Sequence, residues 1–361
     1  MYKRQGWNCH QYHANTEYYA NYGRFKVEIT VPKRFVVGAT GPEVARRENP
    51  DGTTTYVHEQ ADVHDFAWTA DPRFLELRER FSADQDVTPA EYAATARLLD
   101  RSLEEVKLKD VELRLLLQPG HEPQAARHFA AAKLAIKWYG LWYGAYPYPT
   151  LTLVDPSPGA GGASGVEYPT LIFCGTSYIF NFWPGKGLLR ETEIVTVHEF
   201  GHQFWYGLVG SNEFEEAWLD EGVNEWADGV VMARLYGEKQ SAIDWMGWQG
   251  EAFRIRRALA GPIDHLPSPI ATAAYAFSDL DAYAGATYDK TMHALRTLEN
   301  VVGRDRFAAA MQGYAKAWAF RHPTGRDFFA SLEDGLGEEL RWFVGPAFYG
   351  TGAIDFAVRS T

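Results

Sequence analysis

The stretch His198-Glu199-Phe200-Gly201-His202 is the most informative part of this chain. On a helix, residues four positions apart lie about 40° apart around the axis and about 6 Å apart along it, so both imidazoles can face one ion. The spacing therefore predicts that His198 and His202 bind a metal. Glu199 lies beside the first ligand, where its carboxylate can accept a proton from a metal-activated water molecule.

A further carboxylate supplies the third ligand. Glu221 lies nineteen residues after His202, within Trp218-Leu219-Asp220-Glu221-Gly222, at the start of a second apolar-periodic helix. Two imidazoles and one carboxylate leave the fourth position of a tetrahedral zinc site open, which is typical of catalytic rather than structural zinc. Asp228, two turns further along, can orient a ligating histidine. The alternative for Asp228 is a solvated acid on the helix surface.

The helix that carries the histidines is expected at about residues 188–208, where apolar residues dominate. A glycine inside such a helix costs about 1 kcal/mol relative to alanine. Gly201 therefore indicates either close packing of another element or a close ligand.

These residues resemble the zinc signature of the aminopeptidase N family, the gluzincin aminopeptidases: H-E-x-x-H, eighteen residues, then Glu within W-L-x-E-G. The family also has a G-x-M-E-N loop whose Glu holds the amino terminus of the substrate. Here the loop contains Gly165, Val166 and Glu167, followed by Tyr168. Val166 replaces Met and Tyr168 replaces Asn, whereas the Glu is kept. The resemblance implies that Gly165, Val166 and Glu167 bind the substrate.

A third motif of the family, Y-x-K-G, contains a tyrosine that stabilises the transition state. This chain has Tyr288-Asp289-Lys290-Thr291 at the corresponding distance, with Thr in place of Gly. The resemblance implies that Tyr288 is catalytic. The resemblance to the family extends from about residue 7 to residue 352.

The resemblance implies a zinc-dependent aminopeptidase that removes amino-terminal residues from peptides by metal-activated water, with Glu199 as general base and one Zn²⁺ per chain. Its partners would be peptide substrates with a free amino terminus. Two alternatives stay open. One is a catalytically impaired peptidase scaffold that acts as a peptide-binding module, and the other is a lipid-epoxide hydrolase on the same zinc site. The W-L-x-E-G context and Glu167 argue against a thermolysin-type endopeptidase.

The implied fold is α+β in two domains. Residues 1–120 would form part of an antiparallel β-rich amino-terminal domain, with a helical insertion at about 74–107. Residues 121–361 would form a mainly helical thermolysin-like zinc peptidase domain with a small sheet. Alternating apolar residues at 23–41 predict two paired strands that turn at residues 32–33, and Thr88 to Glu91 predicts the start of a helix that reaches about residue 106. Both chain ends suggest part of a longer enzyme.

The amino-acid composition limits the classes of partner that are expected to bind this protein. The chain has 361 residues, of which 46% are hydrophobic, and a formal net charge of −12, which argues against nucleic acid as a partner. It has no apolar run of 18 or more residues, so no membrane-spanning helix is expected. Cys9 and Cys174 match no zinc or redox spacing and are expected to be small buried residues, although one disulfide stays possible. The sequence leaves the cellular compartment open.

Overall fold

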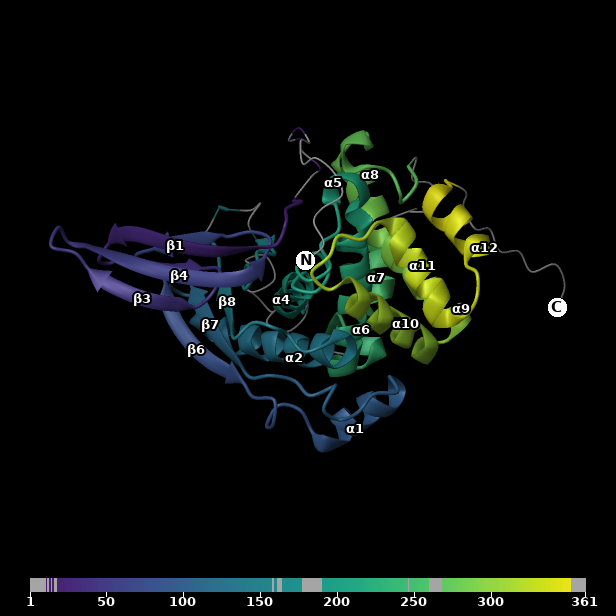
Figure 1. Cartoon of the computed structure of the whole chain (residues 1–361), viewed down its shortest axis with the longest axis horizontal. Helices are drawn as coiled ribbons and strands as arrows, with labels where there is room; N and C mark the ends of the chain where they lie inside the picture. Colours follow the sequence, from purple (N-terminus) through teal and green to yellow (C-terminus); the bar gives the residue numbers. More distant parts are fainter. Residues whose placement is uncertain are drawn as a thin grey trace.

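The computed structural model describes residues 18–157, 159–160, 164–176, 190–245, 247–259 and 268–351, together with residues 11, 13 and 15. A strand-rich part leads into a mainly helical part, and the two pack against each other (Figure 1). The predicted α+β class is confirmed. Among the described residues, no helix is both long and apolar enough to cross a membrane. Cys9 lies outside the described residues, and Cys174 is a buried free thiol.

The first strands form two small antiparallel sheets. β1 (Gly23–Pro32), β4 (Thr53–Val63) and β3 (Glu43–Glu48) form one sheet in the order β1-β4-β3, and β2 (Val36–Ala39) pairs with β5 (Trp68–Asp71) in another. The predicted pairing of the strands at 23–41 is therefore wrong. Ile29 and Val31 of β1 instead pack against Val37 and Ala39 of β2 in one buried cluster, so the two strands meet through their side chains.

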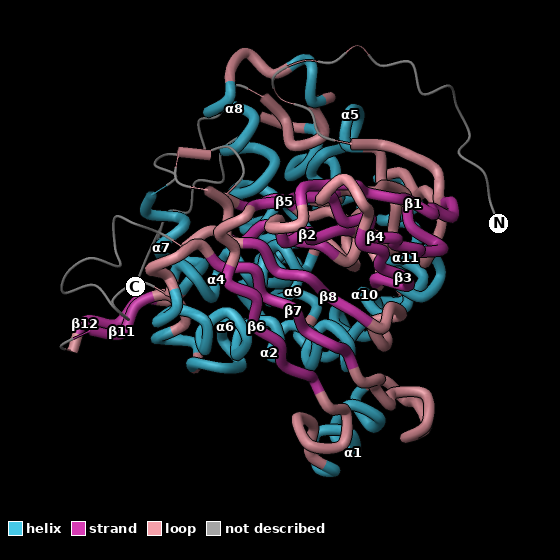
Figure 2. Tube along the Cα trace, turned by 90° about the vertical axis from the view of Figure 1, so that its left-hand side faces the viewer, coloured by secondary structure: helices cyan, strands magenta, loops and turns pink. Residues whose placement is uncertain are grey.

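A five-stranded mixed sheet follows. Its order is β6-β7-β8-β10-β9, made by β6 (Leu75–Phe81), β7 (Val111–Leu117), β8 (Thr150–Val154), β10 (Leu171–Cys174) and β9 (Gly165–Val166). Figure 2 shows β6, β7 and β8 side by side. The sheet includes strands from both sides of residue 120, the predicted domain limit. It also includes the first strand of the segment at 74–107 that was expected to be a helical insertion.

The helix of that segment is α1 (Pro89–Leu98), which begins at the predicted Thr88–Glu91 capping box. It is shorter than predicted. Asp100 has left-handed backbone geometry with φ 49°, and the amide of Arg101 bonds back to the carbonyl of Ala96, which ends the helix near residue 99.

α2 (Ala125–Tyr143) lies between the five-stranded sheet and several of the later helices. This buried helix contacts β6 and β7 of the sheet on one side and α4, α6 and α10 on the other. The helices and π-helical turns that follow are α4 (Glu191–Gly201), α5 (Glu213–Glu216), α6 (Glu221–Tyr236), α7 (Ala252–Leu259), α8 (Leu280–Ala284), η7 (Gly285–Lys290), α9 (Thr291–Val302), α10 (Arg304–Trp318), α11 (Gly325–Leu336), α12 (Arg341–Val344) and η8 (Gly345–Tyr349). One large buried cluster joins α2, α4, α6, α9, α10 and α11.

The helix that bears the histidines ends earlier than predicted. α4 stops at Gly201, and residues 202–208 fold back through turns, with the amide of Gly207 bonded to the carbonyl of His202. Close packing accounts for the glycine. A Cβ at position 201 would collide with the side chain of Asn224 on α6 and with the hydroxyl of Tyr139 on α2. The three helices therefore pack tightly against one another next to His198 and His202.

We expect Gly201→Ala to lower the free energy of unfolding by about 1–3 kcal/mol, the usual cost of overpacking a tight contact. Chemical denaturation would measure it. Gly313→Ala in α10 is the matched control, because nothing lies within 4 Å of a Cβ there. The control should be neutral or stabilising by up to about 1 kcal/mol, since alanine is the better helix former. Equal stability of the two variants would contradict the packing argument.

Candidate metal centre

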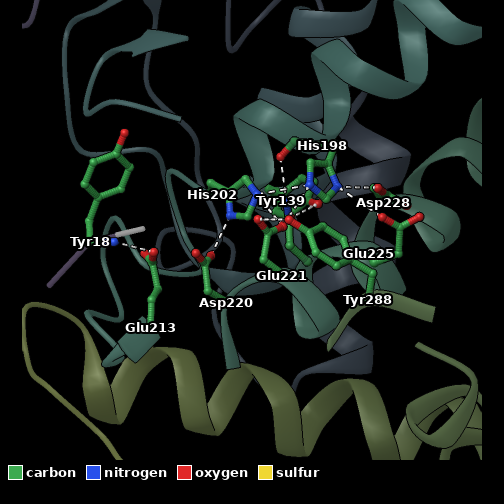
Figure 3. Close-up of polar contacts among 11 residues, drawn as sticks. Tyr18, Tyr139, His198, His202, Glu213, Asp220, Glu221, Glu225, Asp228 and Tyr288 are labelled. Carbon is green, nitrogen blue, oxygen red and sulfur yellow. Dashed lines mark hydrogen bonds and ion pairs between the residues drawn. The ribbon is translucent and has the colours of Figure 1, made fainter. Parts of the chain in front are cut away.

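Three side chains from two adjacent helices meet at one point (Figure 3). His198 and His202 lie at the carboxyl-terminal end of α4, and Glu221 is the first residue of α6. The two Nε2 atoms are 3.1 Å apart, and Oε2 of Glu221 lies 3.2 Å from each of them. The structure therefore brings together the three ligands that the sequence predicted.

Whether a metal ion fits between these three atoms depends on the hydrogen bonds of the two Nδ1 atoms, because these bonds determine which ring nitrogen carries the proton. Nδ1 of His198 lies 2.9 Å from Oδ2 of Asp228, and Nδ1 of His202 lies 2.5 Å from Oδ1 of Asp220. When each Nδ1–H donates to its carboxylate, each Nε2 directs a lone pair into the triangle. Ligands of a tetrahedral zinc at about 2.0–2.1 Å are about 3.3–3.4 Å apart, close to the observed spacing. The donor set and its spacing fit Zn²⁺.

Both histidines are held by buried acids. Asp228 is only 4% exposed, so it is not the solvated surface acid that was the alternative. Asp220 is fully buried, and Glu225 lies 3.5 Å from Nδ1 of His198. Burial lowers the pKa of His198, but its hydrogen bonds to Asp228 and Glu221 outweigh this effect, and the net shift is upward. The sequence analysis gave no role to Asp220 or Glu225.

A buried amide fixes the backbone between the two histidines. Nδ2 of Asn224 donates to the carbonyl of His198 at 2.7 Å, and its Oδ1 accepts from the hydroxyl of Tyr139 at 2.9 Å. Sequence reasoning missed both residues. Position 224 is one turn after Glu221, so helical spacing from the predicted ligand was the available signal.

Glu199 lies beneath the edge strand of the five-stranded sheet. A Cβ on Gly165 of β9 would collide with the carboxylate of Glu199, so only a glycine lets the strand pass this close. Burial raises the pKa of Glu199 to about 8. The charges of His198 and His202 act in the opposite direction, and Glu167 adds to the rise. A buried carboxyl group beside two imidazoles is a suitable proton acceptor and donor.

The predicted substrate-binding residues lie on and just after β9. Val166 is half-buried and pairs with Phe173 of β10, and Glu167 comes directly after it, only 5% exposed. β9 is the last strand in the described sheet order. Gly165 thus lies directly against the carboxylate of Glu199, and Glu167 is near enough to raise the pKa of that group.

Tyr288 also reaches the triangle. Its hydroxyl donates to Oε1 of Glu221, and its ring is stacked 6.3 Å from that of His198 (Figure 3). The residue lies in η7, a π-helical segment between α8 and α9. Such segments are frequent at functional sites.

Comparisons with known proteins agree with this geometry. The model of the family described as the peptidase family M1 domain matches residues 130–346. Aminopeptidase M1-B of Oryza sativa subsp. japonica is 25% identical over 237 residues, which cover 65% of this chain and 26% of that protein. Probable aminopeptidase 2 of Sulfurisphaera tokodaii is 26% identical over 248 residues, or 66% and 30% of the two chains. This chain thus spans about a quarter to a third of these relatives.

Two solved structures share the fold. A variant of the M1 zinc metallopeptidase from Deinococcus radiodurans superposes with a TM-score of 0.65 at 17% identity, covering 93% of this chain and 66% of that chain. Aminopeptidase A of Legionella pneumophila, solved with aspartic acid, superposes with a TM-score of 0.68 at 16% identity. The match covers 91% of this chain and 35% of that chain.

We expect Asp228→Asn to weaken zinc binding by about 10–100-fold, because the amide no longer fixes the tautomer and orientation of His198 as a carboxylate does. Competition against a chelator of known affinity would measure this. Glu299→Gln is the matched control, since that buried carboxylate bonds Trp226 and Arg296 and not a histidine. Zinc affinity equal to that of the control would leave Asp228 with a purely structural role.

Proposed function

This chain belongs to peptidase family M1, and we propose that it forms the catalytic part of a zinc aminopeptidase that removes residues from the free amino end of peptides. The triangle of His198, His202 and Glu221 carries this proposal. Its spacing suits one ion, and a buried carboxyl group, Glu199, lies next to it.

Zn²⁺ is the cofactor that the family and the donor set indicate. Nε2 of His198, Nε2 of His202 and Oε2 of Glu221 would hold it. When bound, the ion lowers the pKa of a water molecule and polarises the carbonyl group of the substrate. The remaining steps depend on side chains of the chain itself.

Glu199 would transfer the protons. Its carboxylate accepts the proton of the attacking water and then passes it to the nitrogen of the leaving amine. Its position under Gly165 supports this role, because a peptide lying along β9 would have its scissile bond close to the Glu199 carboxyl group. Burial also keeps bulk water from exchanging that proton.

Tyr288 would stabilise the negative charge that develops on the carbonyl oxygen. In the structure its hydroxyl donates to the outer oxygen of Glu221, so the O–H group is already directed at the ligand triangle. During reaction it would donate to the oxyanion instead. A hydrogen-bond donor of this kind contributes about 10²–10³-fold to turnover.

Glu167 would hold the ammonium group of the substrate. It lies one residue beyond β9 and is buried, so its carboxylate can bind an ammonium at the end of a peptide paired with that strand. A peptide that continued past this carboxylate would bury the negative charge without a partner, which is costly. Cleavage would therefore be confined to the amino end.

The intact set of ligands and base favours catalysis over an impaired scaffold. His198, His202, Glu221 and Glu199 are all present and converge.

We expect Glu199→Gln to keep one zinc per chain and to lose about 10²–10⁴-fold in turnover of aminoacyl-anilides, because an amide cannot accept the proton. Glu191→Gln, at the start of the same helix, is the control and should retain activity. Comparable turnover by both variants would remove Glu199 from the mechanism.

We expect Glu167→Ala to abolish the preference for a free amino terminus, because the ammonium loses its carboxylate partner. The measurement is kcat/KM for a free peptide and for its N-acetylated form, before and after the substitution. The ratio should fall by about tenfold or more, the value of one charged hydrogen bond. An unchanged ratio would assign amino-terminal recognition to other residues.

A further inference from the structure

A second group of acids lies beside the metal centre. This three-carboxylate cluster consists of Glu167 after β9, Glu213 at the start of α5, and Asp220 just before α6. One oxygen of each lies within 4.8 Å of one oxygen of the other two. The three residues are 5%, 1% and 0% exposed. In Figure 3, Glu213 and Asp220 stand next to each other with their carboxylates pointing in the same direction.

Each acid of the cluster has an unpartnered oxygen. Oε2 of Glu213 accepts from the backbone amide of Tyr18 at 2.6 Å, and Oδ1 of Asp220 accepts from His202. In contrast, Oε1 of Glu167, Oε1 of Glu213 and Oδ2 of Asp220 are buried with no hydrogen-bond partner among the described residues. Buried carboxyl oxygens without hydrogen-bond donors are costly. Three of them in one place indicate a cationic ligand that carries several donors.

The number and spacing of the oxygens favour an ammonium group. Three atoms no more than 4.8 Å apart can all lie about 2.8 Å from one central atom, which is the usual N⁺–H···O⁻ distance. An ammonium offers three N–H donors for three acceptors. Calcium needs about six to eight oxygen ligands, and zinc prefers imidazole and thiolate. The cluster supplies three oxygens, too few for calcium and of the wrong type for zinc.

We propose that Glu213 and Asp220 join Glu167 in a three-oxygen receptor for the ammonium group at the amino terminus of the peptide. This inference rests on the proposed function and deepens it. One carboxylate binds an ammonium but lets it pivot, whereas three acceptors fix its orientation. That orientation sets where the first peptide bond lies relative to Glu199, so Glu213 becomes a specificity-determining residue supplied by a separate element, α5.

The receptor can be tested by binding without turnover. Zinc-loaded Glu199→Gln protein would be titrated calorimetrically with leucyl-glycine whose amino terminus is free, N-methylated, N,N-dimethylated or N-acetylated. The methylated peptides keep the positive charge and lose one or two N–H donors. Affinity should fall by about tenfold for each lost donor. If the N-methyl peptide bound as tightly as the free peptide, a single carboxylate would suffice and the receptor would be refuted.

A variant of the cluster gives a second measurement. Glu213→Gln, added to the same background, should weaken the free peptide by about tenfold and leave the N-acetylated peptide and the zinc content unchanged. Glu216→Gln is the matched control, because it lies on the same helix but bonds the backbone amide of Gly325 outside the cluster. Equal affinity of the two variants for the free peptide would overturn the proposal.

Metal analysis and activity separate the remaining outcomes. A second bound metal ion per chain that disappears in Glu213→Gln would make the cluster a metal site and not an ammonium receptor. If the enzyme with Glu199 cleaves free peptides in preference to acetylated ones while Glu213→Gln binds normally, only the receptor fails. If it cleaves no peptide under metal-replete conditions, the proposed function fails, and the methylation series still decides the receptor.

Discussion

The structure of this centre depends on one arrangement, in which two buried carboxylates hold the Nδ1 atoms of two histidines one helical turn apart. Asp228 and Asp220 each accept the proton of one ring, so both Nε2 lone pairs are directed at Oε2 of Glu221. The two Nε2 lone pairs and the carboxylate oxygen, 3.1–3.2 Å apart, repel one another unless a cation lies between them. The contacts that orient the rings therefore also create the affinity for a divalent ion.

Helix packing sets the distance between the two histidines on α4 and Glu221 on α6. The absence of a side chain at Gly201 lets Asn224 of α6 and Tyr139 of α2 lie against α4. Asn224 then bonds the carbonyl of His198, which ties the backbone of the first ligand to the helix that supplies the third. A wider separation of α4 and α6 would break the triangle without altering any ligand, so the buried core is part of the metal site.

The sequence indicated which side chains would converge, in part because the spacing of the two histidines is local. His198 and His202 share a helix, and Glu221 was expected from its place at the start of the next one. The family resemblance, now confirmed, added Glu167 and Tyr288. Strand partners and helix ends were predicted less well. Alternation at 23–41 indicates which side chains share a face, but it does not say whether β1 pairs with β2 or with β4. The contact of residue 202 with Asp220 depends on turns after α4 and before α6, which no periodicity encodes.

Glu213 shows the same limit more sharply, and its position also connects the two halves of the site. Its neighbours in the cluster, Glu167 and Asp220, are 46 and 7 residues away in sequence. The loop after β9 and the turns between α4 and α6 bring the three residues together. Asp220 belongs to both groups: its Oδ1 orients the ligand His202, and it contributes one oxygen to the cluster with Glu167 and Glu213.

A cation bound in the three-carboxylate cluster would draw electron density from Asp220 and so change how strongly it holds the His202 ring. Binding of a peptide amino terminus in the proposed receptor and the strength of the metal site would thereby be coupled through a single side chain.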